Sequence, residues 1–151
     1  MRRIFLIILF VNFPFILYSD DDVKEAKIAK YVMENIQKDY VNCYSFYKVA
    51  AESFKAANKE KSLVENLENS ADVALKYYFD LGEIMGLNPE VMAQITKDKV
   101  NNFVKLAKND FKSLAKEHGL VCKNLVENPE QRTNFWEKKA KEINKRKKNF
   151  Y

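Results

Sequence analysis

The chain has 151 residues, enough for one domain, and 47% of them are hydrophobic, so it can form a core and is not a disordered protein. Three glycines and three prolines are too few for the many turns of an all-β fold. The net charge of +5 comes from 22 lysines against only four arginines, so it gives little support for nucleic-acid binding, for which arginine is preferred.

The first 19 residues have the pattern of an export signal. Arg2 and Arg3 precede an apolar run over residues 4–17, and Ser19 is a small residue before three aspartates. Because a membrane-spanning helix needs roughly 20 apolar residues, we expect cleavage after about Ser19 rather than a retained membrane anchor or a buried core helix. The sequence therefore predicts an exported protein, periplasmic or secreted, whose residues 20–151 form a single helical domain.

The first predicted helix covers residues 23–58, and either Asp21 or Asp22 can cap it. Its apolar residues recur at steps of three and four, which is the period of one helical face. That stripe consists of Ile28, Val32, Ile36, Tyr40, Cys43, Tyr47, Ala50, Phe54 and Ala57.

The second predicted helix begins with a capping box formed by Ser62 and Glu65, and Gly86 ends it in the left-handed conformation. Its stripe consists of Leu63, Leu67, Ala71, Ala74, Tyr78, Leu81 and Met85.

The third predicted helix begins at Pro89, behind the cap Asn88, and ends at Gly119. A short apolar piece over residues 120–126 follows, and Asn128 opens a last helix whose stripe fades toward the end of the chain. Short loops between long amphipathic helices favour antiparallel neighbours. The expected fold is therefore all-α, an up-and-down bundle of three long helices plus a shorter C-terminal one.

No motif for catalysis or for a cofactor is present. There is no glycine-rich phosphate loop and no nucleophile elbow, and the paired carboxylates match what 31% charged residues give on solvated faces. His118 is the only histidine, placed at the expected end of the third helix, where it can favour the negative end of the dipole. The other interpretation makes it a haem ligand opposite Met33, Met85 or Met92. We expect no enzyme, no metal and no cofactor.

Aromatic residues cover more than one face of the first two predicted helices. Such a helix is either central in a bundle or offers a second face to a partner or to another copy. The candidate partner surface consists of Tyr44, Phe46, Tyr77 and Phe79.

The C-terminal segment is strongly basic. Residues 138–151 carry seven Lys or Arg and one acidic residue, Glu142, a net charge of +6. A solvated helix end that is frayed from about residue 144 explains this run, and contact with an anionic envelope surface is the alternative. The candidate contact residues are Lys145, Arg146, Lys147 and Lys148.

The only two cysteines, Cys43 and Cys122, predict one disulfide, because an exported chain meets an oxidising compartment. In a straight bundle the third helix would end near residue 58, about 22 Å along the first helix from Cys43 at 1.5 Å per residue. The bond therefore requires oblique helices or a segment that folds back across the first helix. Two free thiols or a bond between chains are the alternatives.

Together these patterns favour an exported, non-catalytic helical protein that binds a protein or an envelope surface. The alternative is a small-ligand or haem carrier with a cavity inside the bundle. The membrane would be contacted only through an uncleaved leader or the basic tail.

Overall fold

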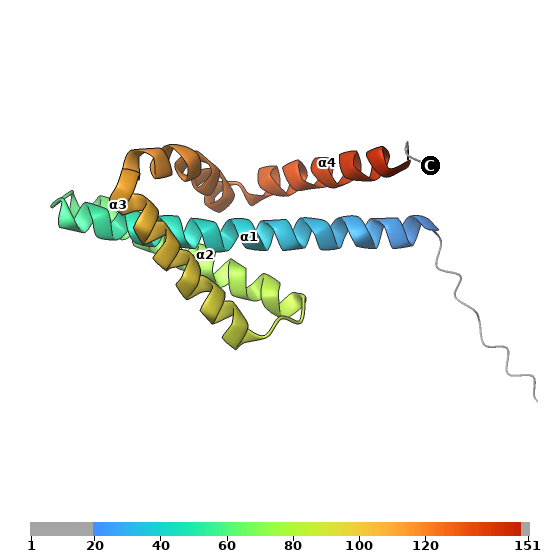
Figure 1. Cartoon of the computed structure of the whole chain (residues 1–151), viewed down its shortest axis with the longest axis horizontal. Coiled ribbons are helices and arrows are strands. Elements are labelled where there is room, and N and C mark those ends of the chain that lie inside the picture. Colours follow the sequence, from blue (N-terminus) through green and yellow to red (C-terminus); the bar gives the residue numbers. More distant parts are fainter. Residues whose placement is uncertain (1–19, 149–151) are drawn as a thin grey trace, which may run out of the picture.

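The computed structural model describes residues 20–148 of the chain, and the side chains of residues 22–145. Four helices follow one another (Figure 1): α1 (Asp20–Ala56), α2 (Lys61–Ile84), α3 (Pro89–Glu127) and α4 (Pro129–Lys148). The predicted all-α fold, with three long helices and a shorter C-terminal one, is confirmed. The predicted leader over residues 1–19 lies outside the described residues.

Helix α1 is the centre of the fold, and each of the other helices packs against it. In Figure 1, α4 lies on one side of α1, and the hairpin of α2 with the first half of α3 diverges from it on the other. The wide apolar arc of α1 is explained by this position, because a helix packed on several sides buries residues on several faces. Its buried apolar residues are Val32, Ile36, Tyr40, Val41, Cys43, Phe46, Tyr47, Val49, Ala50 and Ala51.

Helix α2 runs antiparallel to α1. Near its end, the Tyr77 ring stacks on Tyr40 with centroids 5.2 Å apart, while near its start Glu68 pairs with Lys55. The predicted capping box is wrong: Glu60 precedes the first turn, no side chain caps the helix, and Ser62 donates a hydrogen bond to the Glu60 carboxylate at 2.8 Å. The Ser62 hydroxyl is therefore not available to the backbone.

The turn between α2 and α3 has the geometry that its residues predict. Gly86 has φ = 68°, a conformation that glycine adopts without steric cost. The Leu87 N–H donates to the Gly82 carbonyl at 2.9 Å, which closes the helix end. The side chain of Asn88 accepts a hydrogen bond from the Val91 N–H at 3.1 Å and so caps α3.

Helix α3 reverses direction at Asp110 (Figure 1), whose backbone is extended at φ = −157° and ψ = 87°. Its carboxylate accepts a hydrogen bond from the Ser113 N–H at 3.0 Å, so Asp110 acts as an N-cap for the second half of the helix. The predicted helix end at Gly119 is wrong, because the second half continues through that glycine to Glu127.

The second half of α3 folds back along α1. As residue numbers rise along α3 they fall along α1: Phe111 contacts Phe54, and Cys122 meets Cys43. This reversal is the fold-back that the predicted disulfide requires, because it brings residues after 119 to the middle of α1.

Helix α4 continues the same antiparallel course toward the start of α1 (Figure 1). Asn128 connects α3 to α4. Its N–H donates a hydrogen bond to the Asn124 carbonyl at 2.8 Å, and its carbonyl accepts one from the Gln131 N–H at 3.3 Å. The described helix extends to Lys148, so the backbone is helical over the stretch in which the sequence predicts fraying. The side chains after Lys145 lie outside the described residues.

Candidate interaction surfaces

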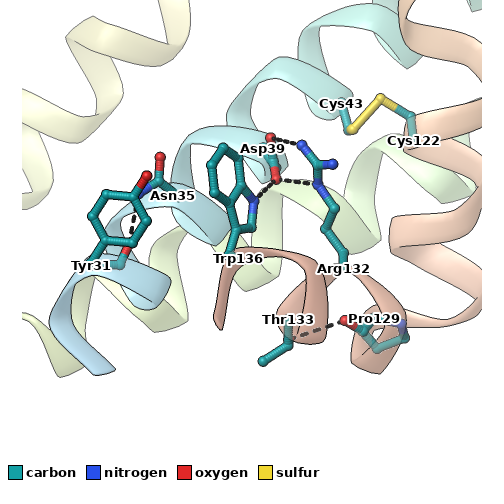
Figure 2. Close-up of polar contacts among 9 residues, drawn as sticks. All are labelled: Tyr31, Asn35, Asp39, Cys43, Cys122, Pro129, Arg132, Thr133 and Trp136. Atoms are coloured by element: carbon teal, nitrogen blue, oxygen red, sulfur yellow. Dashed lines mark hydrogen bonds and ion pairs between the residues drawn. A yellow bond between two sulfur atoms is a disulfide. The ribbon is translucent and has the colours of Figure 1, made fainter. Parts of the chain in front are cut away.

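Two contacts attach the C-terminal half of the chain to α1, one helical turn apart (Figure 2). The first is the disulfide: the structure joins Cys43 and Cys122 with their Cα atoms 5.2 Å apart, and both side chains are buried. The second is an ion pair between Asp39 and Arg132. Asp39 and Cys43 are four residues apart, so they lie on the same side of α1.

The Asp39 carboxylate accepts three hydrogen bonds from α4 (Figure 2). Arg132 donates through Nε at 2.7 Å and through Nη2 at 3.1 Å, and Trp136 donates through its indole N–H at 2.6 Å. The Arg132 guanidinium also lies 4.9 Å from the Trp136 ring centre, and the Tyr31 ring meets the same indole edge to face. The Asp39 carboxylate is paired with both Arg132 and Trp136, so we assign the cluster to the attachment of α4 and not to catalysis.

The sequence patterns did not predict this cluster. One signal was available: Tyr31, Asn35, Asp39 and Cys43 recur at steps of four, which places a carboxylate on a side of α1 that also carries a buried cysteine. The partner Arg132 lies 93 residues away, and no local pattern links the two positions.

His118 lies inside the second half of α3, not at a helix end as the sequence predicted. Its ring packs 4.8 Å from the Phe103 ring and 6.3 Å from the Phe46 ring, so it joins the two halves of α3 to α1. Burial lowers the pKa of His118 below its ordinary value, with nearby Lys99 acting in the same direction and Glu117 against it. The imidazole is therefore a half-buried group that is neutral at neutral pH.

The four aromatic residues of the predicted partner surface do not form one surface. Phe46 is only 6% exposed and belongs to the core, because the folded-back half of α3 covers it. Tyr44 and Phe79 are half-buried and pack against the core. Tyr77 is exposed, but its ring rests on Tyr40, whose pKa is raised to about 12, chiefly by burial and also by Tyr77.

Among the described residues, exposed apolar side chains recur at the free end of the α2–α3 hairpin. Figure 1 shows this end projecting away from α1. Four aliphatic side chains there, which we call the hairpin tip, are largely exposed: Ile84 (71%), Leu87 (44%), Val91 (56%) and Ile95 (45%). Isolated exposed apolar residues are normal, whereas several at one end of a fold make that end a candidate interaction surface.

The hairpin tip also differs in charge from the rest of the chain. Residues 77–96 contain no lysine, arginine or histidine, although the whole chain has 26 Lys and Arg among 151 residues. The same stretch has three acidic residues, Asp80, Glu83 and Glu90, a net charge of −3. A groove of about 640 Å³ lies between the tip and α1, and its lining includes Met33, Met85 and Leu87 together with Lys30, Glu34 and Lys38 of α1.

The candidate anionic-surface residues lie in the basic C-terminal end of α4. Lys145 is exposed at the end of α4 and, with Lys141, lines a groove of about 790 Å³ against the start of α1. Arg146, Lys147 and Lys148 continue the helix, and their side chains lie outside the described residues.

Within residues 20–148, no group of three or more His, Cys, Asp or Glu side chains is placed to hold a metal ion. Over the same stretch, none of the helices combines the length and apolar character needed to cross a membrane. No protein family model matches the sequence, and neither a curated protein nor a solved structure matches it.

Proposed function

We propose that this chain is an exported, non-catalytic helical protein that acts by binding a protein partner through the hairpin tip. The observation that carries the proposal is the exposure of Ile84, Leu87, Val91 and Ile95 together, in a stretch of 20 residues without a positive charge. Within residues 20–148, these side chains have no part in the buried core, and an apolar surface of this kind is suited to binding a protein partner.

The attachment of the hairpin to α1 supports this proposal. Gln37 of α1 donates a hydrogen bond to the Tyr78 carbonyl at 3.3 Å, and the Tyr78 hydroxyl donates to the Met92 carbonyl at 3.4 Å, so α1, α2 and the first half of α3 are linked near the tip. A stiff scaffold that presents a preformed apolar tip loses little conformational entropy on binding.

The test compares proteins that co-purify with tagged wild-type and variant chains from the native host. The double substitution Leu87→Ser with Val91→Ser removes apolar surface at the tip, and Leu120→Ser is the matched control, because Leu120 is 69% exposed on the other half of α3. We expect a partner to be lost from the tip variant and kept by the control. Equal recovery with both variants would contradict the proposal.

Mass spectrometry of the mature protein tests the exported location. The intact mass of the mature protein is expected to begin at or near Asp20. A membrane-embedded species that retains Arg2 and Arg3 would contradict cleavage and support an anchor.

A second candidate function is adhesion to an anionic envelope surface, favoured by the net charge of +6 over residues 138–148 of α4. Flotation with phosphatidylglycerol vesicles tests it, with phosphatidylcholine vesicles as the control. Substitution of residues 145–148 by glutamine is expected to abolish binding to the anionic vesicles. Binding that survives this change would contradict a role for the basic end.

A further inference from the structure

One side of α4 combines an exposed aromatic ring with lysines. Trp136 faces α1 through its bond to Asp39, whereas the neighbouring Phe135 is 42% exposed. Lys139 lies one turn further along, with its ammonium group 5.9 Å from the Phe135 ring centre and 3.7 Å from the Glu142 carboxylate. We call this side, with the adjoining Lys138, the outer face of α4. It lies in a helix that carries a net charge of +6 from residue 138 to residue 148.

The outer face of α4 complements the hairpin tip in both charge and polarity. The tip stretch has a net charge of −3 and four exposed aliphatic side chains, and the outer face offers positive charge around an apolar ring. Asp80 is paired with Lys76, but two tips brought together would still set Glu83 and Glu90 of one copy against those of the other, which opposes a symmetric tip-to-tip dimer. Charge therefore favours contact between a tip and an α4.

A chain cannot make this contact within itself. Figure 1 shows the hairpin tip and α4 on opposite sides of α1, which separates them. The contact is therefore between copies. Because it joins two different surfaces, each bound copy still has one free tip or one free α4, and association continues into longer assemblies or rings.

We propose that the partner of the hairpin tip is a second copy of this chain, bound through the outer face of its α4. This rests on the proposed function, since it names the partner of the same tip. The contact has an apolar centre of aliphatic side chains against Phe135 and an ionic rim of acidic residues against Lys138 and Lys139, the arrangement of a specific interface.

Sedimentation velocity of the full chain, expressed for export, tests the proposal. We expect the mean mass of wild type to rise with concentration and to fall with added salt, because salt screens the ionic rim. Two one-sided variants, Val91→Lys and the double variant K138E/K139E, are each expected to weaken association by about tenfold or more. Leu120→Lys is the control, because it changes an exposed apolar residue outside both surfaces.

The decisive sample is an equal mixture of the two one-sided variants. Val91→Lys keeps an intact α4 and K138E/K139E keeps an intact tip, so the mixture is expected to form dimers and nothing larger. A mixture that stays monomeric, or wild type that associates more strongly as salt is added, would overturn the proposal. Circular dichroism of each variant checks that the helices are retained, and Ile84→Lys repeats the tip test at a second position.

A monomeric wild type at every concentration would also overturn self-association. If the Leu87→Ser/Val91→Ser variant still lost a co-purifying protein in that case, the tip would bind a different protein. Only the present inference would then fall, and the proposed function would stand.

Discussion

Replacing Asp39 by alanine should detach α4 from α1. The substitution removes all three hydrogen bonds that the carboxylate accepts and leaves the Arg132 charge and the Trp136 N–H without this acceptor. Breaking a buried ion pair costs about 3–5 kcal/mol. The side chains of Asp39 and Arg132 are 12% and 22% exposed, so water partly replaces the lost partner and the lower end applies. We expect a loss of about 3 kcal/mol, or roughly 10 °C in Tm.

Urea denaturation followed by circular dichroism measures that loss. Trp136 is the only tryptophan, so a shift of its fluorescence to longer wavelength reports directly on the α4 contact. Arg132→Met should cost much less in the Asp39→Ala background than in wild type, because its charge has already lost its partner. The matched control is Asp80→Asn, in an exposed ion pair with Lys76, which should leave Tm nearly unchanged. An Asp39→Ala variant as stable as this control would refute the reasoning.

Four further outcomes are expected. The native protein, denatured without reductant, should contain no alkylatable thiol, and two free thiols would contradict the bond. The disulfide closes a loop of about 80 residues, so removing it should lower the free energy of unfolding by up to about 4.5 kcal/mol. Gly82→Ala should lower stability by about 1–3 kcal/mol, because its Cβ would overlap the Met92 side chain, and an unchanged urea midpoint would show that Met92 repacks. The proton NMR signal of His118 should titrate below pH 6.5. The free energy of unfolding should fall as pH drops from about 6.5 toward the folded-state pKa of His118, because the unfolded chain takes up the proton first. The His118→Gln variant should lack this pH-dependent loss of stability. Truncation after Ile143 should leave Tm nearly unchanged, and a large loss would show that the removed residues contribute to the core.

The parts of the fold that depend on local chemistry could be predicted from the sequence. Helix periodicity, the left-handed Gly86 and the cap Asn88 each act within a few residues, so a short window contains the physical cause. The disulfide could be predicted because two cysteines leave one pairing within the chain. The wide apolar arc of α1 could also be recognised in the sequence, although it did not distinguish a central helix from a helix that binds a partner.

The reversal at Asp110 was missed because the apolar period continues through it. Phe103, Ala107, Phe111 and Leu114 keep steps of four, four and three, so the stripe predicts one straight helix. Only the capping preference of Asp110 marked the break. The Asp39–Arg132 pair was missed for a different reason: it depends on that reversal, and residues 93 apart have no sequence period in common.

The measurement that most directly tests the hairpin tip as the interaction surface is site-specific photo-cross-linking in the native host. A photoreactive phenylalanine analogue is placed at Val91, at the tip, or at Leu120, which has comparable exposure on the other half of α3. We expect a discrete cross-linked product from position 91, with the attached peptide identified by mass spectrometry, and little or none from position 120. Equal yields from both positions, or none from position 91, would contradict the assignment of the tip as the binding surface.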